Sequence, residues 1–403
     1  MLRSDCIVCG SRRLETIVDL GMHPFADTFI SEARLSEPDL VYWLACDLCL
    51  DCGQIQTKCI TNPEDRYCRH DYSYTSSNSA FSRKHWKAYA AAVTEQVGLK
   101  QGAFVVEVGS NDGFLLEQFR VSGARVLGVD ASPFMARLAQ EQEVDTLVGL
   151  FGLEISNQIR KEYGCADLIV ANNVFNHAND VVGFAEAARE LLSENGTFVF
   201  ELPYWCIGLR DGRFDQIYHE HVSYFTATSA RKLLDTAGLA IVHIEVVDYH
   251  GGSLRVFAKK KEDMTCSCAT VDRMVEEEQK AGTFVPARYC EFMSSIYMQR
   301  NRFLENLYHM KCAGIPIIGV GAAAKGNTFL NFYNLDSTVI DCVTDSSKYK
   351  QGKFTPGSRI PIRGDDVFGD YDQVAALILS WNLPGTLKEN LLGLNPRIQF
   401  LVP

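Results

Sequence analysis

The sequence predicts an α/β protein: a doubly wound parallel sheet, preceded by a small cysteine-rich module and followed by a second, smaller α/β domain. Three observations lead to this prediction. The first 70 residues are rich in cysteine and turn-forming residues and contain only short apolar runs. From about residue 83, apolar runs alternate with helical segments, as in a parallel sheet covered on both faces. A second set of strand-like runs begins near residue 312.

The length of the chain indicates more than one domain. Single hydrophobic cores stop growing at roughly 250–300 residues, so we expect the 403 residues to form three domains, at 1–70, 71–262 and 263–403. The middle domain should take its parallel strands from FVVEVGS, ARVLGVD, ADLIVANN and GTFVFELP, followed by an antiparallel pair, IVHIEVVDY and SLRVFAKK. One polar helical connector is expected from about 269 to 311, before the strands IPIIGVG, STVIDCVTD and QVAALILS.

Composition limits the partners and the location. The formal charge of -11 argues against a nucleic-acid partner, because binding to phosphates requires clustered Lys and Arg. Neither a secretory apolar segment nor an apolar run of roughly 18 residues is apparent, so we expect a cytoplasmic protein with no membrane partner, as a monomer or small homo-oligomer. Fourteen cysteines in such a protein suggest metal ligands and buried thiols rather than disulfides.

Four cysteines near the start have the spacing of a metal site. Cys6 and Cys9 form one C-x2-C pair, Cys49 and Cys52 form the other, and a glycine follows each pair. Four thiolates complete the tetrahedral shell of Zn²⁺, so we expect a structural zinc ion that takes no part in the chemistry. Cys46 is an alternative ligand that spacing alone does not exclude.

An acidic strand end and a glycine turn follow the first strand of the middle domain. The turn has the pattern E-x-G-x-x-x-G, from Glu107 through Gly109 and Asn111 to Gly113. Glycines allow the backbone to approach a ligand closely, and the carboxylate suits the positively charged amino acid tail of S-adenosylmethionine. A dinucleotide pyrophosphate prefers G-x-G-x-x-G with no carboxylate nearby. The turn therefore favours S-adenosylmethionine over NAD.

Further polar residues fall where the next strands end. Asp130 closes ARVLGVD, the position at which an acid binds ribose hydroxyls in doubly wound nucleotide sites. Asn172 and Asn173 follow ADLIVA at the same carboxyl edge of the sheet. The expected cofactor-binding residues are Glu107, Gly109, Asn111, Gly113, Asp130, Ser132, Asn172 and Asn173.

The segment 214–225 combines two histidines, a carboxylate and two tyrosines directly after the fourth major strand. Removing a proton from a carbon next to a carbonyl requires a positioned base, and neutral histidine fits this role. A neighbouring carboxylate fixes its tautomer, and a phenol donates to the developing enolate oxygen. A metal site of His219, Glu220 and His221 is the weaker alternative, because adjacent residues in a strand alternate faces. His177 lies near the same sheet edge.

A second glycine turn lies in the C-terminal region. Residues 319–328 follow a strand, open a helix and match G-x-G-x-x-A, and Asp345 stands at roughly the distance expected of a ribose-binding acid. Alone, this turn predicts an NAD-dependent oxidoreductase. The stronger S-adenosylmethionine signal upstream favours a secondary nucleotide-binding or structural role.

Taken together, the cysteine pairs, EVGSNDG, NNVFNHA, YHEHVSYF, HGGSLR and GVGAAAKGNTFLNFY resemble the deoxysugar C-methyltransferases, in order over nearly the whole chain. These enzymes methylate nucleotide-linked 4-keto sugars at C-3. The resemblance implies a class I methyltransferase Rossmann-like domain that binds S-adenosylmethionine, an N-terminal zinc-binding module, and a smaller Rossmann-like C-terminal domain that binds a nucleotide-linked keto-sugar of the dTDP or GDP type.

The resemblance also implies roles for particular residues. His221 is the general base, and Glu220, Tyr218, Tyr72 and His177 line the active site. The residues implied to hold the nucleotide-sugar are Ser253, Arg255, Lys325, Asn327 and Thr328. The alternative function keeps the methyl donor but assigns an O- or N-methyl acceptor on another small metabolite.

Overall fold

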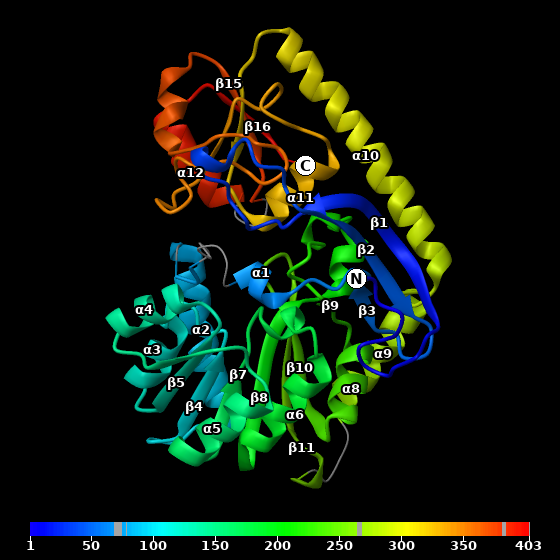
Figure 1. Cartoon of the computed structure of the whole chain (residues 1–403), viewed down its shortest axis with the longest axis vertical. Coiled ribbons are helices and arrows are strands. Elements are labelled where there is room, and N and C mark those ends of the chain that lie inside the picture. Colours follow the sequence, from blue (N-terminus) through cyan, green and yellow to red (C-terminus); the bar gives the residue numbers. More distant parts are fainter. Residues whose placement is uncertain (68–74, 78, 264–267, 381–383, 403) are drawn as a thin grey trace. The chain divides into compact units, whose positions relative to one another are not determined.

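The computed structural model describes residues 1–67, 75–77, 79–263, 268–380 and 384–402 (Figure 1). The chain forms two compact units, and each draws on segments that are distant in the sequence. The first unit contains Met1–Thr16, Asp47–Gly208 and Val222–Pro286. The second contains Ile17–Cys46, Leu209–His221 and Ala287–Pro403. The strands β1 (Leu14–Pro24) and β2 (Val41–Cys49) and the short helix α7 (Trp205–Arg210) each contribute residues to both units.

The first unit is built on a seven-stranded sheet with the order β10-β11-β8-β7-β4-β5-β6. Five neighbouring strands are parallel, whereas β11 runs antiparallel to both β8 and β10. The strands are β4 (Phe104–Val108), β5 (Arg125–Asp130), β6 (Thr146–Val148), β7 (Ala166–Val170), β8 (Leu192–Pro203), β10 (Leu239–Val247) and β11 (Ser253–Lys260). The strand order reverses between β4 and β7, and ligands bind at such switch points, beyond the carboxyl ends of the strands.

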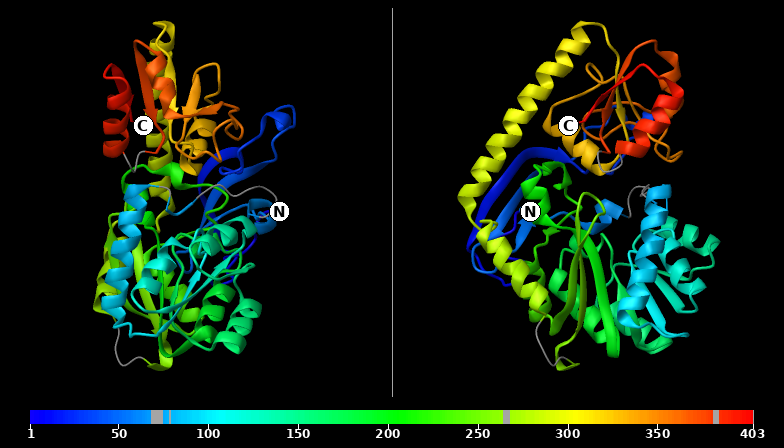
Figure 2. Two further views of the ribbon diagram at one scale, coloured as in Figure 1. Left: turned by 90° about the vertical axis from the view of Figure 1, so that its left-hand side faces the viewer. Right: turned by 180° about the vertical axis from the view of Figure 1, so that it is seen from behind.

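Helices cover both faces of this sheet (Figure 2). Successive residues of β4 show why, because Val105 packs in a core with Trp86 and Phe114, whereas Val106 packs in a core with Phe184. The sheet is therefore buried on both sides, and its strands are continuously apolar, as expected. The helices of this unit are α1 (Pro63–Tyr67), α2 (Ala80–Val97), α3 (Phe114–Val121), α4 (Pro133–Glu141), α5 (Leu153–Tyr163), α6 (Val181–Leu191), α8 (Ala227–Thr236) and α9 (Ala269–Lys280).

The N-terminal strands form a small separate sheet. Its order is β1-β2-β3-β9, where β3 is Ile55–Thr57 and β9 is Ser223–Tyr224. Ile55 pairs with Tyr224 in an antiparallel register, and the amide of Thr57 donates to the Val222 carbonyl over 2.9 Å. Within the first unit, β3 is therefore tied by backbone hydrogen bonds to the chain that follows YHEH.

The second unit contains a five-stranded parallel sheet with the order β14-β13-β12-β15-β16. The strands are β12 (Ile317–Val320), β13 (Cys342–Thr344), β14 (Ile362–Arg363), β15 (Val374–Ile378) and β16 (Ile398–Leu401), and the helices are α10 (Pro286–Cys312), α11 (Ala324–Phe332) and α12 (Pro384–Leu394). The expected strand over STVIDCVTD is shorter than predicted. Its first residues form a turn in which the amides of Val339 and Ile340 donate to the Asp336 carbonyl.

The expected single connector is two helices, which corrects the prediction of one helical stretch over 269–311. The helix α9 ends before Gly282, which has a left-handed φ of 70°, and Pro286 begins α10. Proline is favoured in the first turn of a helix and glycine just after the end of one, so the break has a local cause.

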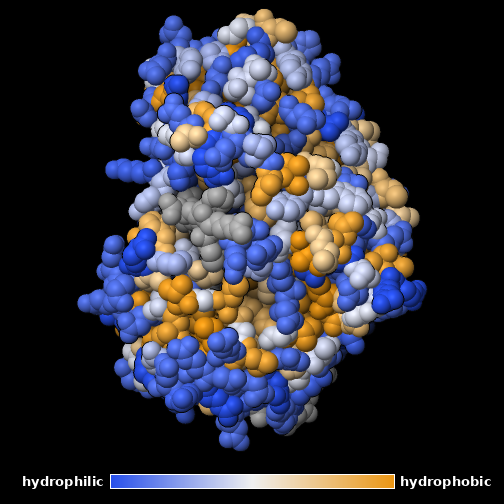
Figure 3. Space-filling model, in the orientation of Figure 1, coloured by the Kyte–Doolittle hydropathy of each residue, from blue (hydrophilic) through white to orange (hydrophobic). Residues whose placement is uncertain are grey.

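No helix among the described residues is long and apolar enough to cross a membrane. Figure 3 shows one face of the molecule, on which hydrophilic and hydrophobic side chains are interspersed.

Candidate active site and zinc centre

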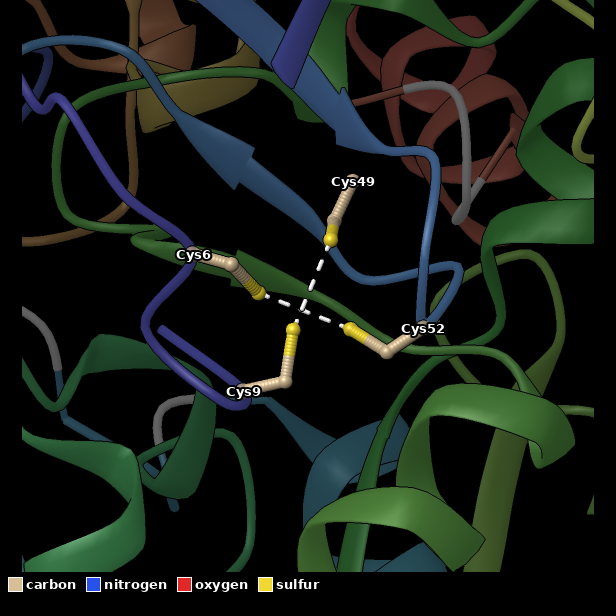
Figure 4. Close-up of side chains that lie close together, drawn as sticks. All are labelled: Cys6, Cys9, Cys49 and Cys52. Atoms are coloured by element: carbon tan, nitrogen blue, oxygen red, sulfur yellow. Dashed lines mark hydrogen bonds between the residues drawn. The ribbon is translucent and has the colours of Figure 1, made fainter. Parts of the chain in front are cut away.

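The four predicted cysteines come together in the first unit. The sulfur of Cys6 lies 3.5 Å from that of Cys52, and the sulfur of Cys9 lies 3.6 Å from that of Cys49. All four sulfurs are within 4.8 Å of one another and point to a common centre (Figure 4). A tetrahedral zinc with Zn–S bonds of about 2.3 Å needs sulfurs roughly 3.8 Å apart, so the cluster fits the ion.

The two cysteine turns have matching backbones. The Gly10 amide donates to the Cys6 carbonyl and the Gly53 amide to the Cys49 carbonyl, both over 2.9 Å. Both glycines have a left-handed φ, of 70° and 74°. These turns therefore present their thiols to the ion at little conformational cost, and the full set of four thiolates leaves no position for substrate. Cys46 is not part of the cluster.

A cavity of about 300 Å³ lies at the carboxyl edge of the seven-stranded sheet, within the first unit. It is lined by the turn after β4, the ends of β5 and β7, and parts of α2 and α6. The predicted residues that line it are Glu107, Gly109, Asn111, Asp130, Ser132, Asn172, Asn173 and His177. Residues from three separate turns thus meet at the switch point of the sheet, as their positions at strand ends predict.

Glu107 carries a buried carboxyl group in this cavity. The residue is 5% exposed, and its Oε2 has no hydrogen-bond partner among the described residues. Burial raises the pKa of Glu107 well above its ordinary value, and the nearby carboxylates of Asp112 and Asp130 raise it further. A buried acid in need of a partner fits a cationic ligand group, such as the ammonium of S-adenosylmethionine.

Asp130 is held in place by two backbone amides. Asn111 donates to its Oδ2 over 2.9 Å, and Ser132 donates to its Oδ1 over 2.8 Å. Burial raises the pKa of Asp130, whereas the two amides oppose that shift. Its carboxylate retains further lone pairs for hydroxyl donors, which suits the two ribose hydroxyls. Ser132 also caps α4, because its hydroxyl accepts from the Met135 amide.

Gly109 and Gly113 serve different purposes in the turn. A side chain on Gly109 would meet Val174 at 2.8 Å, so only glycine allows the turn to pass this wall of the cavity. Gly113 does not line the cavity. It has a φ of 78° and starts α3, and a side chain there would press on Ala139 and Val144. Gly113 therefore permits packing between α3 and α4, which differs from the predicted contact with the cofactor.

Several lining residues were missed by the sequence analysis. Trp86 from α2, Leu150 and Phe151 after β6, and Phe184 from α6 supply the apolar walls. Apolar residues at helical spacing are common in any core, so no local pattern marks them. Ser76 also lines the cavity. Tyr72, which the family resemblance implies for the active site, lies outside the described residues.

His221 in the second unit is fixed by two hydrogen bonds. Its Nε2 lies 2.6 Å from the Tyr218 hydroxyl, and its Nδ1 lies 2.9 Å from the Gln216 carbonyl. Because a carbonyl only accepts, Nδ1 carries the proton and Nε2 is left as the basic atom, facing the phenol. Burial lowers the pKa of His221 to about 3, and the Lys325 ammonium contributes to the shift. The imidazole is therefore neutral at physiological pH.

His219 and Glu220 do not form a metal site with His221. His219 packs edge-on against Phe25 and Tyr42, with ring centroids 5.7 and 5.8 Å away, and burial lowers its pKa to about 4. Glu220 is 2% exposed. Among the described residues, the four cysteines are the one group that gathers as metal ligands do.

The first five residues of α11 contain the three predicted residues of the C-terminal glycine turn, Lys325, Asn327 and Thr328. Burial lowers the pKa of Lys325 to about 8, and the Asp215 carboxylate opposes this shift. Asn327 Nδ2 donates to the Ala26 carbonyl over 2.6 Å, and the Thr328 hydroxyl donates to the Ile217 carbonyl over 3.3 Å. Lys325 is therefore cationic at neutral pH, whereas the other two side chains hold neighbouring loops of their own unit.

Asp345 occupies the position of a ribose-binding acid beside that turn, but it is already paired. It accepts from the amides of Ala322 and Ser347, over 2.9 and 2.8 Å. The ammonium of Lys350 lies 3.7 Å from its Oδ2 and donates to the Ala322 carbonyl over 2.6 Å. An internal cation thus neutralises the acid, which favours a structural role for this turn over dinucleotide binding.

Ser253 and Arg255 lie on β11 of the first unit and do not line its cavity. The Ser253 hydroxyl donates to the Tyr249 carbonyl over 2.9 Å. Arg255 is 6% exposed and pairs with Glu201 at 2.7 Å and Glu245 at 3.0 Å. Both side chains are therefore engaged within their own unit.

Comparison with known proteins gives consistent matches along the chain. A zinc binding domain matches residues 6–67, a methyltransferase domain residues 82–244, and the C-methyltransferase C-terminal domain residues 248–399. The C-methyltransferase NovU of Streptomyces niveus is 30% identical over 386 residues, which cover 96% of this chain and 91% of that protein.

Solved structures match a smaller part of the chain. An S-adenosylmethionine-dependent methyltransferase from Clostridium acetobutylicum is 16% identical, with a TM-score of 0.36, over 44% of this chain and 92% of that one. Magnesium protoporphyrin IX methyltransferase from Synechocystis, with bound SAH, is 18% identical, with a TM-score of 0.36, over 44% of this chain and 83% of that one.

The sheet order, the cavity at its switch point, the four-cysteine zinc site and a relative that matches almost end to end agree with one another. The protein has a class I methyltransferase Rossmann-like domain and uses S-adenosylmethionine. The chain belongs to the C-methyltransferase family.

Proposed function

We propose that this enzyme methylates C-3 of a nucleotide-linked 4-keto-6-deoxysugar, with His221 as the general base. The observation that carries the proposal is the pair of hydrogen bonds that fix His221, from Tyr218 on Nε2 and to Gln216 on Nδ1. A C-methyltransferase must form a carbon nucleophile, and a neutral imidazole of defined tautomer next to a phenol supplies both a base and an acid for enolisation.

The proposed step begins with proton removal. A keto group at C-4 acidifies the C-3 proton, His221 Nε2 takes that proton, and Tyr218 turns its hydroxyl to the developing enolate oxygen. The C-3 carbanion equivalent then forms a bond to the methyl carbon as the bond from that carbon to sulfur breaks. Bound S-adenosylmethionine supplies the methyl group and leaves as S-adenosylhomocysteine. The proton stays on His221 until solvent removes it.

The low pKa of His221 has a consequence for this step. A pKa of about 3 keeps the base unprotonated at neutral pH, but it lies below the value at which a general base is most effective. An enolate beside the imidazolium would stabilise the charged form and raise that pKa in the complex. Much of the rate enhancement should therefore come from positioning and from stabilisation of the enolate.

We assign the other proposed residues by their contacts. Lys325, cationic at the start of α11, is the residue proposed to hold the diphosphate of the sugar nucleotide, of the dTDP or GDP type. Asn327 and Thr328 then position the loops that they bind. His177 lines the cofactor cavity of the first unit, whereas Glu220 belongs to the second unit, and the roles that the family resemblance implies for them stay predictions. A cytoplasmic location and a monomeric or small homo-oligomeric state stay predictions of the sequence.

The proposal is tested by following both hydrogen and methyl groups. The enzyme is incubated with a nucleotide-linked 4-keto-6-deoxysugar in deuterium oxide, first with S-adenosylhomocysteine and then with S-adenosylmethionine. We expect exchange of the C-3 hydrogen in the first reaction and a new methyl group on C-3 in the second, both read by NMR. Methylation at oxygen or nitrogen, or no reaction with any such sugar, would overturn the proposal.

A further inference from the structure

Residues 75–77 form a short segment that is tied to the glycine turn of the cofactor cavity by hydrogen bonds to one carboxylate. The Ser76 hydroxyl donates to Asp112 Oδ1 over 2.6 Å. Ser77 donates to Asp112 Oδ2 twice, from its hydroxyl over 2.6 Å and from its amide over 3.1 Å. Asp112 is 3% exposed, so these bonds are shielded from water. Charge-assisted hydrogen bonds of this length are among the stronger ones in proteins.

Asn111, the residue before Asp112, connects the same segment to Asp130, the predicted ribose-binding acid. The Ser76 amide donates to Asn111 Oδ1 over 2.8 Å, and the Asn111 amide donates to Asp130 Oδ2 over 2.9 Å. Asn111 has a left-handed φ of 51°, which its short polar side chain tolerates. Ser76, Asn111 and Asp130 all line the cavity. Ser76 is therefore part of the cavity wall, and hydrogen bonds through Asn111 join it to the acid at the end of the neighbouring strand β5.

Asp112 itself does not line the cavity. Apart from the effect of its charge, Asp112 can therefore act on the cofactor only through the residues that it holds, such as Ser76. We propose that Asp112 is a positioning residue, which holds residues 75–77, and with them Ser76, in place at the cavity wall and thereby sets the rate at which S-adenosylmethionine and S-adenosylhomocysteine leave. The inference rests on this cavity being the S-adenosylmethionine site.

Two substitutions separate hydrogen bonding from charge. Asp112 also raises the pKa of Glu107 and of Asp130, so losing its charge alters the cavity electrostatically. Asp112→Ala and Asp112→Asn remove the same charge. The asparagine keeps one carbonyl acceptor for a serine hydroxyl and offers an amide donor to the other, whereas alanine keeps neither. The difference between the two variants therefore reports the contacts of the Asp112 side chain, with the loss of charge held equal.

The main measurement is the dissociation rate of S-adenosylhomocysteine by stopped-flow displacement, which needs no sugar substrate. We expect Asp112→Ala to release the ligand on the order of 10- to 100-fold faster than the wild type, and Asp112→Asn to fall in between. Hydrogen exchange of the Ser76 and Ser77 amides gives a direct second reading, because both donate to side chains of the turn. Their protection should fall in Asp112→Ala.

A double-mutant cycle with Ser77→Ala completes the test, since the Ser77 side chain does not line the cavity. Ser77→Ala should speed release in the wild-type background and have no further effect in Asp112→Ala. If Asp112→Ala does not fold, Asp112→Asn and Ser77→Ala still provide the comparison. Equal dissociation rates for the wild type and the variants, or additive effects, would overturn the inference. Failure of the wild type to bind S-adenosylhomocysteine would instead overturn the assignment of the cavity.

Discussion

Replacing Glu107 with glutamine removes a buried charge from the cofactor cavity and keeps the shape of the side chain. Glu107 is 5% exposed, and its Oε2 has no hydrogen-bond partner among the described residues, so a ligand ammonium would give this oxygen a charged partner. A hydrogen bond to a charged group contributes about 1.5–3 kcal/mol, which corresponds to about 10- to 150-fold in the dissociation constant. Glu107→Gln should weaken S-adenosylhomocysteine binding by that factor.

Proton release provides a second reading of the same contact. Because burial raises the pKa of Glu107, a larger fraction of this carboxyl is protonated at a given pH than in an exposed glutamate, and that fraction must ionise when the cationic ligand binds. Titration calorimetry in two buffers of different ionisation enthalpy should show proton release by the wild type and less release by Glu107→Gln. Glu141→Gln, an exposed change on α4, is the matched control. Unchanged affinity together with unchanged proton release would refute this role for Glu107.

The same shift predicts how stability depends on pH in the ligand-free protein. The folded pKa of Glu107 lies above its unfolded value near 4.5, so the folded state binds the proton more tightly than the unfolded state does. Its contribution to stability is complete below pH 4.5 and is lost as the pH rises through the folded pKa. The free energy of unfolding of Glu107→Gln should therefore exceed that of the wild type increasingly as the pH rises from 4.5, in urea titrations.

Three further predictions concern the zinc, the base and the connector. Cys49→Ala should lose its zinc and melt at a lower temperature, whereas Cys46→Ala should keep the metal, as measured by elemental analysis and calorimetry. Because the pKa of His221 is about 3, wild-type kcat/KM should not fall on the acid side near pH 6.5, and an acid limb with a pKa near 6.5 would contradict this. His221→Asn should abolish C-3 hydrogen exchange but bind S-adenosylhomocysteine normally. Glu278→Ala should lower the free energy of unfolding by about 2–3 kcal/mol, whereas a neutral result would show that its bonds to the α8 amides contribute little.

The sequence was most informative about functional residues that lie at the ends of strands or in tight turns. The four cysteines gather as their spacing predicts, and Glu107 and Asp130 line the cavity near the ends of β4 and β5, where their binding of the cofactor stays a prediction. The side chains that form the apolar walls, such as Trp86 and Phe184, were not predicted, because they reach the cavity through tertiary packing of helices. Sequence spacing carries little information about such contacts.

The sequence also did not predict which residues form ion pairs with the buried charged side chains. Arg255 stood out as a cation in a glycine-rich motif, yet its guanidinium is matched by Glu201, which is 54 residues away in the sequence. Lys350 likewise pairs with Asp345 and offsets the acid that made the C-terminal turn look like a nucleotide site. A single sequence shows which residues carry charge, but the pairing of Arg255 depends on which strands become neighbours, and that of Lys350 depends on how the loop after β13 folds.

The most direct test of the proposed function is the fate of the methyl carbon. The enzyme is given S-adenosylmethionine labelled with ¹³C in the methyl group, together with nucleotide-linked 4-keto-6-deoxysugars, and the product is examined by two-dimensional NMR. The proposal predicts a labelled methyl group with a direct carbon–carbon coupling to C-3 and loss of the C-3 proton signal. A labelled methyl group on oxygen or nitrogen, with the C-3 proton retained, would contradict it.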